Sequence, residues 1–413
     1  MRTARVRSVG ERIGGTDWRQ RTDAGVRRAR GLLRGRPTLS VVVPVYNVAE
    51  YVEKSLRSIL DQPRSEIAKL EVIVVDDGST DGSAQILRRL AAEEACVTVI
   101  TQSNSGVSRA RHTGIDAATG ELLTFVDPDD TLPHDAWSAM VRSLRRTGSD
   151  FAVGAAERVA VEGGVERRFM TPLMRRNHAE ERLRCQIEDA PLMLADIFVW
   201  NKIFRRSFWT ENAIAFPERT RYQDQVALTQ VFLAADSFDV MTEIVYDWQV
   251  RSDRSSATQP RAQIANLVER IDTKRQTIEL VRAAGSAKLM ETLLVEVLPI
   301  DMWEHFRAAV HPDTEDPGRY WKLLRGAVLE FWYDAGVPFE NTTVPRAQRL
   351  MAWLVAQDRA EDLTALIAMI DRYGARAAFR QHPWRNDPVL PPDLGHIEEV
   401  GGGALLTRQP MRG

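Results

Sequence analysis

The chain has 413 residues, of which 44% are hydrophobic, so it is long enough to form two or three globular units with buried cores. Its 55 Lys and Arg residues nearly balance its 57 Asp and Glu residues, which argues against a general nucleic-acid-binding protein. The two cysteines lack the C-x-x-C spacing of zinc or redox sites, and neither an apolar run of 18 residues nor a secretory signal is readable, so we expect a cytoplasmic protein.

Residues 1–36 form a basic extension with eleven Arg and three acidic residues. Such a composition is typical of a flexible leader without a specific role. The alternative is a basic element in GVRRARGLLRGRP, with Val26, Leu32 and Leu33 on an apolar side, that contacts anionic lipid at the inner face of the membrane. Both interpretations stay open on the sequence.

Between residues 37 and 130, four apolar runs of strand length alternate with helical patterns. The runs are LSVVVPV, LEVIVVD, VTVIT and ELLTFV, and such runs are typical of buried parallel strands. Helical patterns lie between them, at residues 48–62, in QILRRLAAEE and in SRARHTGIDAATG, which Gly120 ends. The alternation predicts an α/β fold with a Rossmann-like, doubly wound and mostly parallel sheet, whose ligands bind at the carboxyl ends of the strands.

The second half of the chain changes from mixed to helical character. A helix is expected at 133–147 and a strand in DFAVGAAERVAV, and beyond Pro260 apolar residues recur at helical spacing. The aromatic residues of this helical region are typical of a core, while a polymer platform or an oligomer interface stays open. The expected units are a basic extension, an α/β domain, a helical domain and a tail, at residues 1–36, 37–257, 258–395 and 396–413.

Acidic residues follow the fourth strand of the predicted sheet, in DPDD. Asp127 and Asp129 stand at alternate positions and are expected to project to one side, where a hard divalent cation would find carboxylate oxygens. The same acids would serve equally well to cap the helix expected from about Pro133. A calcium loop in DDGSTDGS is excluded, because Arg88 stands where a bidentate Glu is required.

Four motifs in order carry a family resemblance: PVYN at 44–47, VDDGSTDGS at 75–83, N-x-G-x-S-x-A-R at 104–111 and FVDPDD at 125–130. Together, and at this spacing, they resemble the family 2 inverting glycosyltransferases of the GT-A fold. The resemblance covers roughly residues 38–255.

The resemblance implies a set of donor contacts at the strand ends. Those expected to bind the nucleotide sugar are Pro44, Tyr46, Asn47, Asp76, Asp77, Asn104, Arg111 and Asp127. In this set Tyr46 would stack on the base and Asp76 would accept from the uracil imide. Asp129 would ligate Mg or Mn, while Asp127 would hold the ribose or a metal-bound water. His112 departs from the family pattern, which often has Asn there.

Later segments supply the expected base and further donor contacts. Asp224 in YQDQVALTQ resembles the general base, although Gln223 replaces the usual acid before it, and Asp224 would also suit a helix cap. Lys202 in WNKIFRR either meets a phosphate or lies over apolar surface. Arg251 and Ser256 resemble a segment that closes over the diphosphate.

The sequence thus predicts a metal-dependent inverting glycosyltransferase. Its expected partners are a nucleotide-sugar donor, carrying UDP, and a cell-envelope polysaccharide, teichoic-acid-like or lipid-linked acceptor. One alternative is a nucleotidyltransferase, although its basic, glycine-rich phosphate loop is missing after the first strand. Another is a catalytically silent sugar- or polymer-binding module, which the retention of Asp127, Asp129 and Asp224 argues against.

Overall fold

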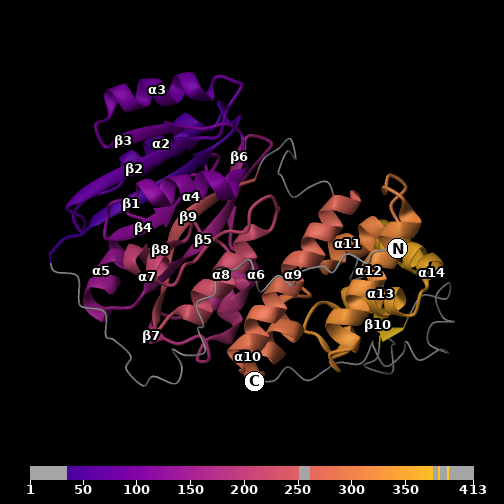
Figure 1. The fold of residues 1–413 in the computed structure, drawn as a ribbon. Coiled ribbons are helices and arrows are strands. Elements are labelled where there is room, and N and C mark those ends of the chain that lie inside the picture. Colours follow the sequence, from indigo (N-terminus) through magenta and orange to yellow (C-terminus); the bar gives the residue numbers. More distant parts are fainter. Residues whose placement is uncertain (1–34, 251–260, 375–379, 382–387, 390–413) are drawn as a thin grey trace, which may run out of the picture. The chain divides into compact units, whose positions relative to one another are not determined.

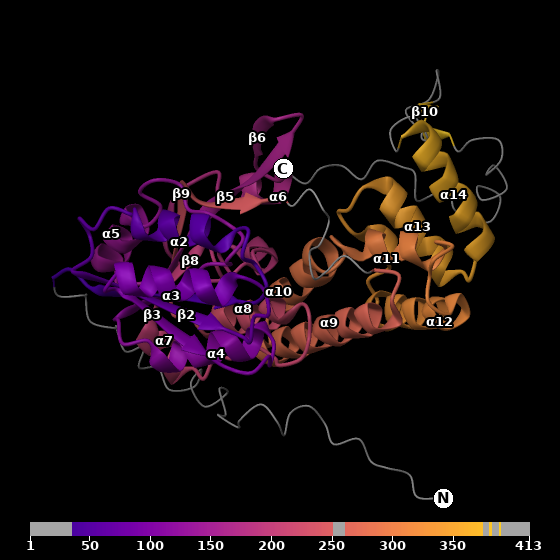
Figure 2. The ribbon, with the colours of Figure 1, turned by 90° about the horizontal axis from the view of Figure 1, so that it is seen from above.

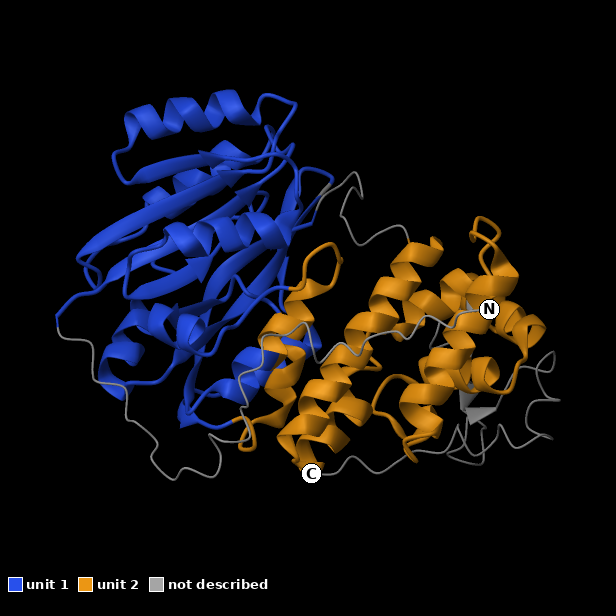
Figure 3. Ribbon diagram, viewed as in Figure 1, with its two compact units in different colours: residues 1–186, 198–216, 230–250 blue, residues 187–197, 217–229, 251–413 orange. Residues whose placement is uncertain are grey.

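The computed structural model describes residues 35–250, 261–374, 380–381 and 388–389. These residues form two compact units (Figure 3). Unit 1 contains residues up to 186 together with 198–216 and 230–250. Unit 2 contains residues 187–197, 217–229 and the described residues from 261 onward.

A nine-stranded sheet forms the centre of unit 1 (Figure 1). The strands are β1 (Thr38–Val45), β2 (Lys69–Asp76), β3 (Val97–Thr101), β4 (Leu122–Phe125), β5 (Phe151–Glu162), β6 (Val165–Phe169), β7 (Arg182–Cys185), β8 (Lys202–Arg205) and β9 (Phe238–Gln249). They lie in the order β3-β2-β1-β4-β8-β5-β9-β7, with β6 paired to β5. Strands β1 to β4 are parallel, as is the pair β5 and β9, while β8 is antiparallel to both β4 and β5. The predicted α/β fold class with a mostly parallel sheet is confirmed.

Helices pack against this sheet and connect its strands. Those of unit 1 are α2 (Val52–Leu60), α3 (Ser83–Glu93), α4 (Val107–Ala117), α5 (Ser138–Thr147), α6 (Pro172–Asn177) and α7 (Arg206–Glu211), and α8 (Gln223–Ala234) begins in unit 2 and ends in unit 1. Figure 2 shows α2, α3 and α4 beside the first strands. Helix α4 lies so close to β1 that a Cβ at Gly114 would collide with the side chain of Val42.

The helix expected at 133–147 begins five residues later, at Ser138. Asp135 has a left-handed backbone with φ of 61°, which a continuous helix does not allow. The residue that precedes α5 is Trp137, and no side chain caps the helix there. The acids of DPDD therefore do not cap this helix, so that alternative to a metal site is wrong.

Unit 2 is built from helices, which confirms the helical C-terminal region. Its elements are η2 (Pro191–Ala195), α9 (Ile264–Ala284), α10 (Ala287–Thr292), η3 (Leu293–Val297), α11 (Met302–Ala309), α12 (Pro317–Val328), η4 (Leu329–Tyr333), η5 (Phe339–Asn341), α13 (Arg346–Ala356) and α14 (Ala360–Tyr373), with the short strands β10 (Arg380–Gln381) and β11 (Pro388–Val389). Phe306, Phe331, Trp332 and Trp353 are buried, as expected of core residues. No helix within the described ranges is long and apolar enough to cross a membrane.

Two segments expected in the α/β domain, 187–197 and 217–229, belong instead to unit 2. Polar contacts within unit 2 explain this. Lys288 of α10 donates to the backbone oxygen of Glu188 at 2.6 Å, and Arg221 forms a 2.9 Å ion pair with Glu269 of α9. A single boundary between two domains cannot describe such segments, because the chain enters and leaves unit 2 twice before its final entry.

A buried histidine gives unit 2 a predicted pH dependence. His305 of α11 is 0% exposed and its Nδ1 lies 2.8 Å from the hydroxyl of Tyr320. Burial, and then the positive charges of Arg261, Arg270 and Lys274, lower the pKa of His305 well below its usual range. The folded protein therefore holds His305 neutral, while the unfolded chain takes up a proton below pH about 6.5. The stabilising effect is complete above that pH and is lost as the pH falls toward the depressed pKa.

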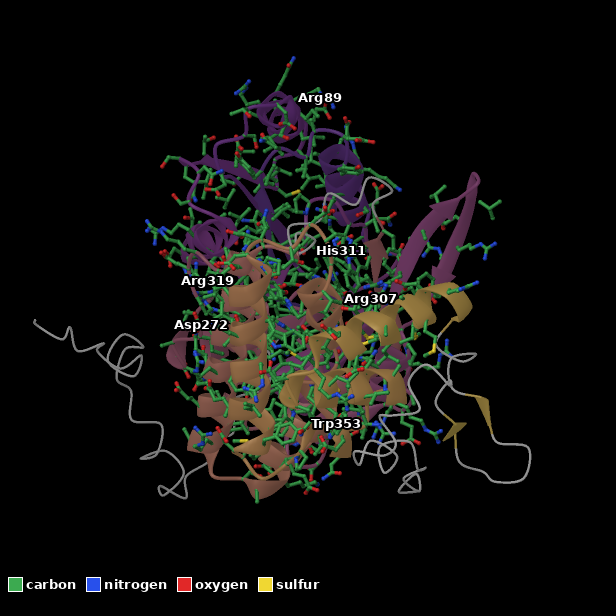
Figure 4. The ribbon with its side chains drawn as sticks, turned by 90° about the vertical axis from the view of Figure 1, so that its right-hand side faces the viewer. Arg89, Asp272, Arg307, His311, Arg319 and Trp353 are labelled. Carbon is green, nitrogen blue, oxygen red and sulfur yellow. The ribbon has the colours of Figure 1, made fainter. Side chains whose placement is uncertain are left out.

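We expect the free energy of unfolding to fall, because of His305, by up to about 1.4 kcal/mol for each pH unit below about 6.5. Urea unfolding at several pH values between 5 and 8 measures this slope, and His305→Phe should make it shallower. The control is His311→Gln, since the side chain of His311 is 56% exposed (Figure 4). A slope that His305→Phe leaves unchanged would contradict the assignment.

Candidate functional site

The four parallel strands bring their following loops to one edge of the sheet. Val45 at the end of β1 pairs with Asp76 at the end of β2, and Asp76 pairs in turn with Thr101 at the end of β3. On the other side of β1, Val42 pairs with Phe125 at the end of β4. This register places the four sequence motifs in neighbouring loops, as expected for ligand binding at a carboxyl edge.

The loop after β1 is locked onto the loop after β2. Asn47 has a left-handed backbone with φ of 51°, its N–H donates to Ser79 Oγ at 3.1 Å, and its Oδ1 accepts from the N–H of Thr80 at 2.8 Å. Beside it Tyr46 is 46% exposed, while Pro44 is buried within β1. Tyr46 therefore presents an accessible aromatic ring at the sheet edge, whereas the Asn47 amide serves the contact between loops.

Asp77 organises the loop after β3. It is 3% exposed, its Oδ1 accepts from Gln102 Nε2 at 2.7 Å and from the N–H of Ser105 at 2.9 Å, and its Oδ2 accepts from the N–H of Gly106 at 2.8 Å. Both carboxylate oxygens are thus engaged by the protein. Asp77 therefore has a structural role in this loop, and its expected contact with a donor stays a prediction.

Asp76 and Asn104 lie on either side of the same close contact between loops. Asp76 is 2% exposed and its Oδ1 accepts from the N–H of Ser79 at 3.0 Å, while Asn104 is exposed. Gly78 joins the two loops: its φ is 77°, and a Cβ there would lie 3.0 Å from the backbone nitrogen of Asn104. Only glycine combines this backbone conformation with this approach.

Arg111 of α4 holds the first acid of DPDD. The guanidinium Nη2 lies 3.0 Å from Asp127 Oδ1, and the side chains are 2% and 29% exposed respectively. The guanidinium also lies 5.0 Å from the centroid of the Phe216 ring. Arg111 is therefore buried and pairs with Asp127, and its expected contact with base or diphosphate stays a prediction.

Tyr246 of β9 fixes the DPDD backbone, a role that the sequence did not predict. The N–H of Asp127 donates to the Tyr246 hydroxyl at 3.1 Å, and that hydroxyl donates to Asp130 Oδ2 at 2.9 Å. Tyr246 stacks on Trp200 with ring centroids 4.0 Å apart. The available signal was a tyrosine within an apolar strand pattern, which does not indicate a partner 119 positions away.

Asp130 differs from the other two acids because it is buried. It accepts from the N–H of Gln249 at 2.8 Å as well as from Tyr246. Burial, followed by the negative charges of Asp129 and Asp127, raises the pKa of Asp130 well above its usual range. Asp127 and Asp129 remain partly exposed, so the chemistry available to a ligand rests with these two carboxylates.

These two carboxylates suit a cation shared with a substrate. Within residues 35–250 and 261–374 no group of three His, Cys, Asp or Glu side chains forms a complete metal site. Mg²⁺ in particular binds through one or two carboxylates and takes further ligands from substrate phosphates and water. Asp127 and Asp129 therefore fit the predicted metal, provided that a diphosphate completes the ligand set.

Lys202 is buried, and its ammonium group is bound by groups of the protein. It is 0% exposed, and its Nζ donates to the backbone oxygen of Phe198 at 2.6 Å and to Asn201 Oδ1 at 2.9 Å. The ammonium also lies 5.7 Å from the centroid of the Phe232 ring. Lys202 is therefore an internal cation that holds the segment before β8, and a phosphate contact is not supported.

The remaining predicted residues lie elsewhere. Asp224 is partly exposed in the first turn of α8, within the part of that helix that belongs to unit 2. Arg251 and Ser256 lie outside the described residues.

Comparison with known proteins finds a family match for part of the chain. Residues 40–208 match the family model described as Glycosyl transferase family 2. The chain contains a glycosyltransferase family 2 domain. This confirms the resemblance that the four motifs carried, and the match includes every strand-end loop described above.

Relatives of the family 2 domain include two proteins from Bacillus. The uncharacterized glycosyltransferase EpsJ of Bacillus subtilis (strain 168) is 29% identical over 213 residues, covering 51% of this chain and 60% of EpsJ. The poly(ribitol-phosphate) beta-glucosyltransferase of Bacillus spizizenii (strain ATCC 23059 / NRRL B-14472 / W23) is 24% identical, covering 65% of this chain and 40% of that enzyme. This chain therefore spans less than two thirds of the length of either relative.

A solved structure shares the fold. The crystal structure of S. aureus TarS 1–349 in complex with UDP-GlcNAc has a TM-score of 0.51 and 19% identity, covering 86% of this chain and 96% of TarS 1–349. At this identity the likeness concerns the fold, and it confirms the predicted GT-A architecture.

The role of Asp77 in the family 2 domain can be tested without any ligand. Asp77→Ala removes the acceptor of the Ser105 and Gly106 amides, so these amides should exchange with solvent at least about tenfold faster, which corresponds to about 1.4 kcal/mol. Hydrogen exchange resolved to residues 102–106 measures the change. Asp116→Ala, at an exposed position of α4, is the control. Unchanged exchange at both amides would show that Asp77 does not order the loop.

Proposed function

We propose that this chain is an inverting glycosyltransferase that moves a sugar from a UDP-sugar to a hydroxyl group of a cell-envelope polymer. The observation that carries the proposal is the convergence of four strand-end loops, within a family 2 domain, on the partly exposed pair Asp127 and Asp129. The names of the relatives support the finer points. TarS was crystallised with UDP-GlcNAc, and the Bacillus spizizenii relative is named for poly(ribitol-phosphate).

In the proposed reaction the donor binds at the carboxyl edge of the sheet. Tyr46 offers its exposed ring to the base, and Asn104, exposed in the loop after β3, is available for a polar contact. Arg111 and Tyr246 hold the side chain and the backbone of Asp127 in place before a ligand arrives. A divalent cation held by Asp127 and Asp129 would supply positive charge that stabilises the diphosphate leaving group.

Asp224 is the proposed general base. An acceptor hydroxyl has a high pKa, so it needs a carboxylate to take its proton as its oxygen attacks the anomeric carbon. The bond from this carbon to the diphosphate oxygen breaks as the new glycosidic bond forms. A single displacement of this kind inverts the anomeric centre and needs one base only.

Replacement of the base should separate turnover from binding. In Asp224→Asn we expect the rate of UDP release to fall by about two to four orders of magnitude, since a general base contributes about that much. UDP affinity, measured by calorimetry, should stay within about twofold, because the base does not contact the nucleotide. The assay uses a panel of UDP-sugars with Mn²⁺. The matched control is Asp272→Asn, an aspartate of α9 whose side chain is 54% exposed (Figure 4).

The outcome of this comparison distinguishes a transferase from a catalytically silent binding module. Wild-type turnover in Asp224→Asn would remove Asp224 from the mechanism. If neither the wild type nor the variant releases UDP from any donor, while both bind UDP, the chain acts as the silent binding module.

Replacement of the metal ligand should act on donor binding instead. In the wild type we expect Mn²⁺ to tighten UDP binding by at least about tenfold, because the cation bridges carboxylates and phosphates. In Asp129→Ala this gain should disappear while metal-free UDP affinity stays similar. Calorimetric titrations of UDP with Mn²⁺ and with EDTA measure the difference, and Asp116→Ala again serves as the control. An Asp129→Ala protein that keeps the full gain would exclude Asp129 as a ligand.

Three further expectations stay predictions. They are a cytoplasmic location, contact of the basic extension with the inner face of the membrane, and an oligomer formed through the helical region. Residues 1–34 of the extension lie outside the described residues.

A further inference from the structure

The residues on both sides of Asp224 are tied to one helix of the same unit. Arg221, Tyr222 and Gln225 each make a side-chain contact with α9, which lies in unit 2 together with residues 217–229. These three anchors lie within five residues, at the start of α8. The three anchors fix the position of the backbone on both sides of Asp224.

Tyr222 is the anchor before Asp224. Its hydroxyl donates to Asn266 Oδ1 at 2.7 Å and accepts from the guanidinium of Arg261. Asn266 is 0% exposed, so this acceptor lies inside unit 2. Burial raises the pKa of Tyr222, and the phenol therefore keeps the proton that it donates.

Gln225 is the anchor after Asp224. It is 3% exposed, and its Oε1 accepts from Arg270 Nη1 at 2.9 Å. The same guanidinium lies 4.4 Å from the centroid of the Tyr222 ring, so Arg270 contacts both Tyr222 and Gln225. Arg270 is itself held by an ion pair with Asp301, which also accepts from Lys274 at 2.8 Å.

A second ion pair extends the attachment at the start of the segment. Glu269 accepts from both the backbone N–H of Arg221 at 2.8 Å and its Nη1 at 2.9 Å. Asn266, Glu269 and Arg270 occupy positions 3 and 4 apart on α9, so they share one face of that helix. One face of α9 therefore binds the whole segment.

We propose that Asn266 and Arg270, acting through Tyr222 and Gln225, are positioning residues for the carboxylate of Asp224. The inference rests on the proposed role of Asp224 as the base. A helix start that is free to shift by 1 Å would move the carboxylate out of reach of the acceptor proton, and a misplacement of that size costs about a hundredfold in rate. The anchors prevent this shift without any contact to the substrate.

The test is a pair of conservative substitutions in the segment. The combination of Tyr222→Phe and Gln225→Met removes both anchoring hydrogen bonds but keeps the aromatic ring and the side-chain volume. We expect kcat for UDP release to fall at least about tenfold, with the KM for the donor within about twofold. The substrate is the UDP-sugar that gives the fastest release in the panel. Because donor contacts are untouched, a change confined to kcat is the signature of a misplaced base.

Rescue distinguishes positioning from general stability. Gln225→Glu keeps an acceptor for Arg270 Nη1 and should retain kcat within about threefold, whereas Gln225→Met should not. The matched control is Arg275→Met, an arginine of α9 whose 2.8 Å ion pair joins Glu330 instead of the segment, and kcat should not change. If the double variant proves unfolded by circular dichroism, Tyr222→Phe alone replaces it, with the same expectation in direction.

The failure of this inference differs from the failure of the proposed function. A loss of turnover in Asp224→Asn together with wild-type kcat in the anchor variants overturns the positioning role and leaves the base in place. Equal loss in Gln225→Met and Gln225→Glu also overturns it. Wild-type turnover in Asp224→Asn overturns both.

Discussion

The ion pair between Arg111 and Asp127 is the interaction on which the candidate donor site depends. A buried arginine needs a partner, and the loop after β4 supplies Asp127, whose backbone N–H also donates to the Tyr246 hydroxyl. The pair joins α4, which follows β3, to the end of β4. Asp77 makes the corresponding connection between β2 and the start of α4. Buried charged side chains thus hold the loops at this edge of the sheet in place.

The two units use charge in the same manner for different ends. In unit 1 the buried acids and Arg111 order the loops of the candidate donor site. In unit 2 Arg270 and Lys274 share Asp301, and burial lowers the pKa of Arg270 to about 10. Removing one member of such a network leaves an uncompensated buried charge, which is costly. The segment that carries Asp224 is attached to this network, so its conformation is linked to the packing of the helical unit.

The sequence predicted what depends on local pattern. Continuous apolar runs marked β1 to β4, and the acids and glycines that follow them marked the loops, because strand and turn chemistry act over a few residues. It did not predict which polar side chains would turn inward. Lys202, Asp77 and Arg111 look like ligand contacts in a motif, yet each is satisfied by groups that only the folded chain brings near. The role of Tyr246 was not predicted for the same reason, since its partners Asp127 and Asp130 come from the loop after β4, far away in the sequence.

The tight seat of α4 on β1 limits how this site can be altered. Gly114 leaves no room for even a methyl group against Val42, so the helix that presents Arg111 is fitted to the sheet at van der Waals range. A larger residue at position 114 therefore requires a smaller side chain at position 42. Ser103 and Asn104 of the neighbouring loop are exposed, so their side chains can be varied as long as position 78 remains glycine.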